Sequence, residues 1–377
     1  MLMIMAVCLF LVAYVWVLYP CAVIVLSSTV LRREIRPPAE WPGVSVIIAA
    51  RNEEAKIAGR IENLLSSEYA GPIEVLVGCD GCTDNTAAIV SGLGKANVKA
   101  VVFDVNRGRA MVHNDIVPLC AHDIVVFTDA ETRFEPDCLG NLVKPFSDPE
   151  VGCSVGLIRY VNAGNSGVSE SAGLYWRMEE AIRVAESRLG ILGFGTGACT
   201  AMRKTLFRKM VSWEDLDYAA TLMLAIGGAR IVYVPEAVAT DFISELASAA
   251  FQTRVRQTSR SFMSIIRRTL PAFRNNTFWI GVASLSHKTG RHLSPFFLLM
   301  LFFSSLAALP HPLAIFLCLL EFLFLTCILV GYLENKKEKR FRPGSIAMSF
   351  FVLNLARGVG VFHAITNRRV SSYSTRI

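Results

Sequence analysis

The feature that most constrains this chain is its first 31 residues, MLMIMAVCLFLVAYVWVLYPCAVIVLSSTVL, which contain no charged side chain. A helix needs roughly 20 apolar residues to cross the hydrocarbon core of a bilayer, and this stretch is longer. It has no basic n-region, and its apolar part is too long for a cleaved signal peptide. We therefore interpret residues 1–31 as an uncleaved transmembrane anchor. The basic RREIR at 32–36 predicts that the chain continues in the cytoplasm.

A second apolar region lies toward the other end of the sequence. Residues 295–333 carry one charged side chain, Glu321, and are interrupted by Pro310-His311-Pro312. A proline-rich interruption of this kind is typical of a tight turn. The pattern therefore predicts two spans, over 295–309 and 313–333.

The stretch 344–366 is less apolar and contains Arg357. A third span and a re-entrant or interfacial helix both fit this pattern. The basic NKKEKRFR at 335–342 favours a return to the cytoplasmic side before it. We therefore expect a C-terminal membrane region over 290–366. The 53% of hydrophobic residues exceeds what a soluble domain usually carries, in agreement with membrane segments at both ends.

The middle of the chain, residues 42–270, has the pattern of an α/β domain. Near-continuous apolar strands alternate with helical periodicity, which indicates a parallel sheet covered on both faces. A helix cap is expected at Thr83 or Asp84. The predicted strands are 44–50, 73–79, 98–104 and 123–129, and the helices include 53–66 and 83–93.

Polar residues follow each of the four predicted strands. Any one of these clusters could serve as a turn or a helix cap. The carboxyl ends of parallel strands meet at one edge of a sheet, where ligands bind. The four clusters together therefore predict one site. They are Arg51-Asn52-Glu53, Asp80, Asn106 to Arg109, and Asp129-Ala130-Glu131.

The segments VSVIIAARNEE, CDGCTDNTA, NRGRAMVHN and FTDAET resemble, in order, the signatures of glycosyltransferase family 2. The resemblance covers roughly residues 42–270, and the flanking apolar segments are similar to those of the membrane-bound branch. It implies the GT-A fold, a Rossmann-like and mostly parallel sheet. It also implies inverting transfer of a sugar from a nucleotide-diphosphate sugar, for which we expect a UDP-linked donor.

The resemblance assigns site residues at the sheet edge. Glu53 and Asp80 are implied to contact the ribose and base, and Arg109 to help bind the donor. Asp129 and Glu131 match the two acids of the D-x-D motif, and hard oxygen ligands suit Mg²⁺ or Mn²⁺. Such an ion neutralises charge on a departing diphosphate. The chain departs from the family pattern in having Glu131 for Asp and Arg109 for Lys.

The downstream acidic pair Glu214-Asp215 resembles the family's catalytic E-D element. This implies that Asp215 is the general base that takes the proton from the acceptor hydroxyl. A helix cap at Glu214 or Asp217 is the structural alternative. The glycine-rich GFGTGACTAMRK at 193–204 resembles the family segment near the acceptor entrance, and a flexible loop fits it equally.

The segment FQTRVRQTSRSF at 251–262 resembles the family's Q-x-x-R-W motif. Gln257 and Arg260 match it, and Arg260 is implied to form paired hydrogen bonds with the diphosphate. Ser261 replaces the tryptophan, which favours transfer of one or a few sugars. The other basic residues, with Phe251, Phe262 and Ile265 between them, predict an amphipathic helix on the membrane surface. They are Arg254, Arg256, Arg267, Arg268 and Arg274.

These features predict a membrane-anchored, metal-dependent, inverting hexosyltransferase. Its catalytic domain would lie at the cytoplasmic face of the cell membrane, and its acceptor would be a lipid, lipid-linked saccharide or glycan. The net charge of +7 suits anionic lipid better than nucleic acid. A non-catalytic assembly or export partner with the same fold is the main alternative, followed by a nucleotidyltransferase. A transporter fits least, because no repeated membrane halves are visible.

Overall fold

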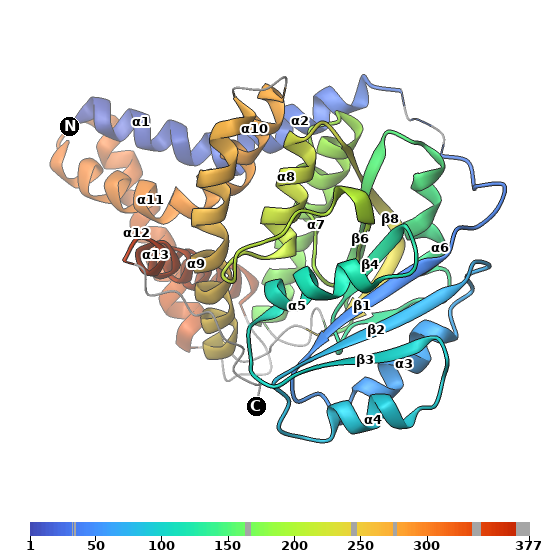
Figure 1. The fold of residues 1–377 in the computed structure, drawn as a ribbon. Helices are drawn as coiled ribbons and strands as arrows, with labels where there is room; N and C mark the ends of the chain where they lie inside the picture. The colour runs from blue at the N-terminus through green and yellow to red at the C-terminus, as the bar shows by residue number, and fades with distance from the viewer. Residues whose placement is uncertain are drawn as a thin grey trace.

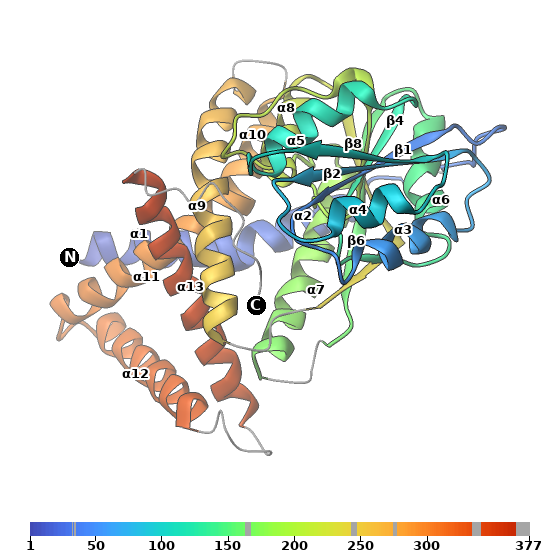
Figure 2. The same ribbon diagram turned by 60° about the horizontal axis from the view of Figure 1, so that its bottom comes forward.

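The computed structural model joins an α/β domain to a group of long helices (Figures 1 and 2). It describes residues 1–31, 33, 35–162, 167–242, 247–273, 277–333 and 341–366. The basic residues used above to predict topology lie partly outside these ranges: Arg32, residues 335–340, and Arg274.

The eight strands form one mixed sheet in the order β3-β2-β1-β4-β7-β6-β8-β5. β3, β2, β1 and β4 are parallel neighbours, as predicted, and β6 is parallel to β8. β7 runs antiparallel to both β4 and β6, and β5 antiparallel to β8. The strands are β1 Val44–Ala50, β2 Ile73–Asp80, β3 Val98–Phe103, β4 Ile124–Thr128, β5 Arg133–Phe134, β6 Val151–Tyr160, β7 Thr200–Arg203 and β8 Arg230–Asp241.

Helices cover both faces of the sheet, because the apolar strands present side chains to both sides. In β1, Val46 and Ile48 pack into one core and Ile47 into the other. Successive side chains of a strand point to opposite faces, so a continuous apolar run requires two cores. The first core includes α3 (Ile57–Leu65), α4 (Thr86–Gly92) and α6 (Cys138–Val143); the second includes α5 (Arg109–Ile116) and α8 (Thr221–Ile226).

Helices α3 and α4 begin four and three residues later than predicted, because the polar residues before them bond between two loops. The Asp84 carboxylate accepts the N–H groups of Glu54 (3.1 Å) and Thr86 (3.0 Å). The Glu54 carboxylate accepts the N–H of Asn85 (3.0 Å). Asn52 has a positive φ of 54°. The N-cap of α4 is Asn85, not Thr83 or Asp84 as predicted, but Asp84 still accepts the first N–H of the helix while it fixes the β1 loop.

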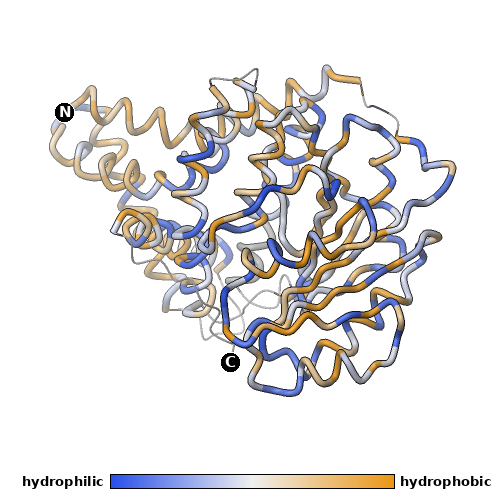
Figure 3. The backbone as a smooth tube through the Cα atoms, in the orientation of Figure 1, coloured by the Kyte–Doolittle hydropathy of each residue, from blue (hydrophilic) through white to orange (hydrophobic). Residues whose placement is uncertain are grey.

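Four helical segments are long and apolar enough to cross a membrane: Leu2–Ser28, Phe278–Ala307, Pro312–Leu333 and Arg342–Ile365. Figure 3 shows their mainly hydrophobic colouring. They comprise α1 (Leu2–Ala13), the π-helical Tyr14–Leu18, α2 (Tyr19–Ser28), α10 (Phe278–Ala283), the π-helical Ser284–Thr289, α11 (Gly290–Ala307), α12 (Pro312–Leu333) and α13 (Arg342–Ile365).

Two further long helices, α7 (Gly167–Arg188) and α9 (Ala247–Ala272), connect the sheet to these segments. α2 packs on α7, and α13 packs on both α7 and α9. The shorter helices are the π-helical Leu216–Ala220 and the 3₁₀ turns Val117–Leu119, Lys144–Ser147 and Lys204–Leu206.

The environment of α9 differs from the predicted membrane-surface helix. Phe262 packs with Val361 of α13, and Ile265 packs with Phe194 and Leu222 of the α/β domain. Both side chains are almost completely buried. The apolar face expected to meet lipid therefore joins the two halves of the protein.

Candidate active site

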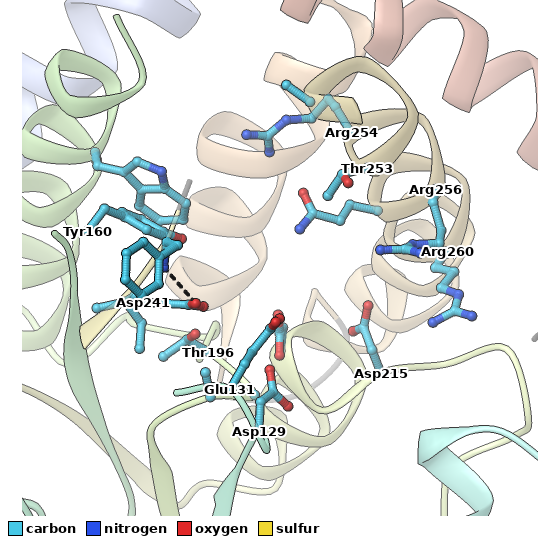
Figure 4. A pocket seen from close by; sticks show the side chains of 18 of the residues that line it. Asp129, Glu131, Tyr160, Thr196, Asp215, Asp241, Thr253, Arg254, Arg256 and Arg260 are labelled. Carbon is cyan, nitrogen blue, oxygen red and sulfur yellow. Dashed lines mark hydrogen bonds between the residues drawn. The ribbon is translucent and has the colours of Figure 1, made fainter. Parts of the chain in front are cut away.

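A cavity of about 480 Å³ lies between the carboxyl edge of the sheet and helices α9 and α13. The ends of β1, β4, β6 and β8 contribute to its walls, together with residues 196–198 and 212–217 and one side of α9. Asp129 and Glu131 project from the sheet side, and the arginines of α9 face them (Figure 4). The cavity therefore brings together the residues predicted after β1, β4 and, at Arg109, β3 with the predicted residues of α9, but it does not include Asp80.

The two acids after β4 lie beside basic side chains. Asp129 Oδ1 is 3.0 Å from Arg109 Nη2, and Glu131 Oε2 is 3.3 Å from Lys56 Nζ. Lys56 also lies 3.9 Å from Glu53 Oε2. Burial raises the pKa of Glu53, with Lys56 opposing and the neighbouring acids adding to the rise. Of the charged residues predicted after β1, β3 and β4, five line the cavity, and Lys56 is an addition to them. The five are Arg51, Glu53, Arg109, Asp129 and Glu131.

The residues present fit a metal that is delivered with its substrate. Asp129 and Glu131 supply the hard oxygen donors that Mg²⁺ and Mn²⁺ prefer. Within the described ranges, no three His, Cys, Asp or Glu side chains are grouped closely enough to hold an ion. Mg²⁺ is commonly bound by one or two carboxylates together with substrate phosphates. Two acids that line one cavity are sufficient for that arrangement.

Asp80 is buried and is not among the residues that line the cavity. Its two carboxylate oxygens accept the N–H groups of Arg107 (2.9 Å) and Gly108 (2.8 Å). Gly108 has φ 87°, a backbone conformation that glycine adopts without strain. Asp80 therefore fixes the turn that directs Arg109 into the cavity, and its contact with a nucleotide base stays a prediction.

Asp215 stands at the start of the π-helical segment and lines the cavity. Its Oδ1 accepts the N–H of Tyr218 (3.1 Å), so it caps that segment. Burial in the cavity wall and then the neighbouring Asp217 raise the pKa of Asp215 to about 7, despite the opposing effect of Arg260. A carboxyl group with a pKa near neutrality is suited to accept a proton in catalysis.

Glu214, the other member of the acidic pair, has a structural partner. Its Oε1 accepts hydrogen bonds from Arg268 Nε (3.2 Å) and Nη2 (2.9 Å), and its Oε2 accepts the N–H of Val211 (3.0 Å). This carboxylate therefore ties the loop to α9. The helix-cap alternative considered for Glu214 or Asp217 applies to Asp215, which both caps the segment and borders the cavity.

Asp217 is a cavity residue that the sequence interpretation treated only as a helix cap. Burial raises its pKa, with Arg109 opposing and Asp129 adding to the rise. A Cβ atom at Gly197 would lie 2.7 Å from Asp217 Oδ1 and 3.2 Å from Arg109 Nη1. A side chain at position 197 would therefore displace the Asp217 carboxylate or the Arg109 guanidinium. The glycines identified the 193–204 loop in the sequence, but they did not indicate that it approaches Asp217.

Gln257 and Arg260 of α9 line the cavity, whereas Ser261 points elsewhere. Ser261 is buried, and its Oγ lies 3.2 Å from His292 Nε2 of α11. The position at which the motif expects tryptophan thus faces α11. A limit of one or a few transferred sugars stays a prediction from the sequence.

Aromatic side chains that the sequence interpretation missed form a further wall. Tyr160, Tyr175 and Trp176 line the cavity. The ring centroid of Trp176 lies 5.4 Å from the ring centroid of Tyr160 and 5.8 Å from that of Tyr175. Tyr175 and Trp176 belong to α7, whose sequence matched none of the signatures, so only the packing of α7 against β8, α2 and α13 brings them here.

The sequence is similar to one protein family over most of the α/β domain. The family model described as "Glycosyltransferase like family 2" matches residues 42–264, which is more than half of the chain. An N-acetylglucosaminyltransferase from Mesorhizobium japonicum is 26% identical over 258 residues, covering 63% of this chain and 59% of the relative. A poly-beta-1,6-N-acetyl-D-glucosamine synthase from Staphylococcus epidermidis is 25% identical over 296 residues, covering 77% and 67%. The chain thus spans about three fifths of the length of the first of these relatives.

The fold was also compared with solved structures. It superposes on the mannosyltransferase PcManGT from Pyrobaculum calidifontis, solved with GDP-Man and Mn²⁺, with a TM-score of 0.71 and 19% sequence identity. The match covers 97% of this chain and 100% of that one. The shared architecture therefore includes the flanking helices as well as the sheet.

Proposed function

Because this chain belongs to glycosyltransferase-like family 2 and has the GT-A fold, we propose that it moves a sugar from a nucleotide-diphosphate sugar to an acceptor hydroxyl at the membrane. One observation carries the proposal: Asp129, Glu131 and Asp215 border the same cavity as Arg260, although they come from distant parts of the chain. Polysaccharide synthases among the relatives support a glycan or glycolipid product.

In this proposal the donor binds along the sheet edge. Asp129 and Glu131 would hold a divalent ion, which supplies charge neutralisation for the diphosphate. Arg109 and Lys56 lie beside these acids, where they can donate charge-assisted hydrogen bonds to phosphate oxygens. Glu53, which lines the same cavity, would accept hydrogen bonds from a ribose. The names of the relatives support UDP-N-acetylglucosamine as the first donor to test.

The acceptor would bind on the opposite side, beside Asp215. Its hydroxyl oxygen attacks the anomeric carbon and transfers its proton to the Asp215 carboxylate. The bond from that carbon to the diphosphate oxygen breaks, and its electron pair leaves with the nucleoside diphosphate. Arg260 donates hydrogen bonds to this leaving group. A single displacement of this kind inverts the anomeric configuration.

The test measures nucleoside diphosphate release by the purified full chain in lipid. The panel contains UDP-N-acetylglucosamine, UDP-glucose and GDP-mannose, with Mg²⁺ or Mn²⁺ and a membrane lipid extract as acceptor. We expect turnover of one donor, a loss of roughly 10²- to 10⁴-fold in Asp215→Asn, and loss of metal stimulation in Glu131→Gln.

Asp104→Asn is the matched control, because Asp104 follows β3 at the same sheet edge but is exposed and does not line the cavity. If the parent binds a donor but releases no diphosphate with any acceptor extract, the transferase proposal fails. A non-catalytic assembly partner would then be the better description.

A further inference from the structure

The cavity has an arm that leaves the sheet edge and reaches a candidate membrane helix. This arm is the part of the cavity lined by Thr253 and Arg254 of α9 and by Ser345, Ser349 and Leu353 of α13. Figure 4 shows Arg254 at the end of the cavity away from Asp129. The arm therefore connects the proposed reaction centre with the helices most suited to lie in lipid.

Three arginines from three helices converge on one aromatic side chain in this arm. The guanidinium carbons of Arg254, Arg291 and Arg357 lie 5.7, 5.6 and 5.5 Å from the centroid of the Tyr175 ring. Arg291 and Arg357 also lie 5.5 and 5.4 Å from the Trp16 ring. Both are only 2% exposed, whereas Arg254 borders the cavity directly.

Within the described ranges, two of the three arginines around Tyr175 lack a carboxylate partner, although acids line other parts of the same cavity. Arg254 and Arg357 form no ion pair in the described part of the chain. Glu179 is shared among several cations, namely Arg183, Lys288 and Arg291. Buried charge without a counter-charge is costly, and charged residues within candidate membrane helices commonly mark ligand sites. These two arginines call for an anion that enters through the arm.

The spacing along α9 separates this anion site from the leaving group. Arg254 precedes Arg260 by six residues, which corresponds to roughly 9 Å along a helix. In the proposed function Arg260 serves the donor diphosphate, and Asp215 takes a proton from a hydroxyl. An ionised phosphate would need no such base. The hydroxyl and the anion are therefore different groups of one acceptor, with a sugar between them.

We infer that this arm binds the phosphate of an acceptor in which a saccharide is linked through phosphate to a lipid. Arg254 contacts the phosphate, and Arg291 and Arg357 stabilise its charge from behind Tyr175. Guanidinium groups match phosphate oxygens in geometry. The apolar side chains of α13, such as Leu353, provide a path for the lipid chain. The placement of the acceptor hydroxyl rests on the proposed function, whereas the binding of the phosphate does not.

The test titrates the full chain in uncharged maltoside detergent with dodecyl phosphate and follows tryptophan fluorescence. We expect saturable binding that weakens about tenfold or more in Arg254→Gln, since a charge-assisted contact is lost. Arg267→Gln is the matched control on the same helix. Its guanidinium lies over Trp213 at 5.7 Å and is not part of the cavity wall.

Two further ligands separate the possible sources of the phosphate. Inorganic phosphate tests for a free anion, and short-chain phosphatidylglycerol tests for bulk membrane lipid. Binding of either one as tight as that of dodecyl phosphate would overturn the assignment to a lipid-linked acceptor. Equal binding of dodecyl phosphate by the parent and Arg254→Gln would overturn the site itself. Arg357→Lys, which keeps the charge but loses the planar fork, is expected to weaken binding as a second variant.

The two proposals fail in different ways. Diphosphate release from a nucleotide-sugar without dodecyl phosphate binding would refute the proposed anion site and support the proposed transferase function. Arg254-dependent binding of dodecyl phosphate without any donor turnover would refute the proposed transferase function and support the proposed anion site.

Discussion

Glu179 and Asp215 are both carboxylates withdrawn from bulk water, and they are partnered in opposite ways. Glu179 accepts hydrogen bonds from His287 Nε2 (2.9 Å), Arg291 Nη1 (2.6 Å) and Lys288. Burial alone would raise its pKa, but His287 and Lys288 outweigh this and hold the pKa well below its usual range. Asp215 caps a backbone N–H and has another acid beside it, and its pKa rises to about 7.

The difference separates a structural role from a chemical one. The carboxylate of Glu179 is fully engaged, and it links α7 to the polar face of the Phe278–Ala307 segment. Glu186 extends this link, because it accepts hydrogen bonds from Tyr19 of α2 (2.7 Å) and contacts His287 Nδ1 (2.8 Å). Asp215 has a raised pKa, so its carboxylate can take up a proton near neutral pH. A satisfied acid stabilises a fold, and a partly satisfied acid at a cavity is available for catalysis.

Removing the charge of Glu179 is expected to give the largest effect on stability. Glu179→Gln leaves Arg183, Lys288 and Arg291 without their shared carboxylate, and breaking a buried ion pair costs about 3–5 kcal/mol. Thermal unfolding of the detergent-solubilised chain measures the loss. Glu180→Gln is the control, since Glu180 is the next residue of α7 and forms no ion pair in the described part. Equal unfolding temperatures in the two variants would show that Glu179 does not stabilise the fold, and the structural role assigned to it would be wrong.

Removing the charge of Asp217 is expected to lower the pKa of Asp215, because a neighbouring like charge disfavours ionisation. Asp215 is a base only when deprotonated, so activity should rise with pH through about 7 in the parent. In Asp217→Asn this rise should move to lower pH by roughly one unit. The pH profile of diphosphate release at low donor concentration measures it. An unchanged profile would mean that Asp215 titrates independently of its neighbour.

Removing the Tyr19 hydroxyl is expected to give the smallest effect. Tyr19→Phe keeps the ring and loses the hydrogen bond to Glu186, which costs about 1 kcal/mol. A small decrease in unfolding temperature, with diphosphate release unchanged, would place this bond in the structural group with Glu179. Tyr332→Phe is the control, because Tyr332 is 64% exposed on α12. A decrease in activity without a decrease in stability would instead connect the Tyr19 bond to catalysis.

Much of the α/β domain was predictable because its signals are local. Apolar runs, followed directly by Asp129 or by Asn52 and Glu53, identified strands whose carboxyl ends meet at one edge. The antiparallel β7 was not predicted, since its four residues follow a glycine-rich loop and carry no alternating pattern. The helix starts at 57 and 86 were displaced by side chains that bond across two loops, and sequence spacing does not reveal such bonds.

The candidate site was predictable only where a motif named it. Asp129, Glu131, Asp215, Gln257 and Arg260 all line the cavity. The separate partners of Glu214 and Asp215 depend on which direction each side chain takes at the start of a π-helical turn. Both acids border the cavity, but Glu214 is paired with Arg268, whereas Asp215 accepts a backbone N–H. Ser261 likewise faces α11 because of its position around α9.

The sequence by itself determined that apolar segments flank an α/β domain and that acids end its strands, because hydrophobic length and strand period are properties of neighbouring residues. The tertiary structure decided which charges share a surface. Arg254, Arg291 and Arg357 are separated by 37 and 66 positions and meet at Tyr175 only because α7, α9, α11 and α13 pack together. Charge interactions depend on distance in space, and only packing sets that distance.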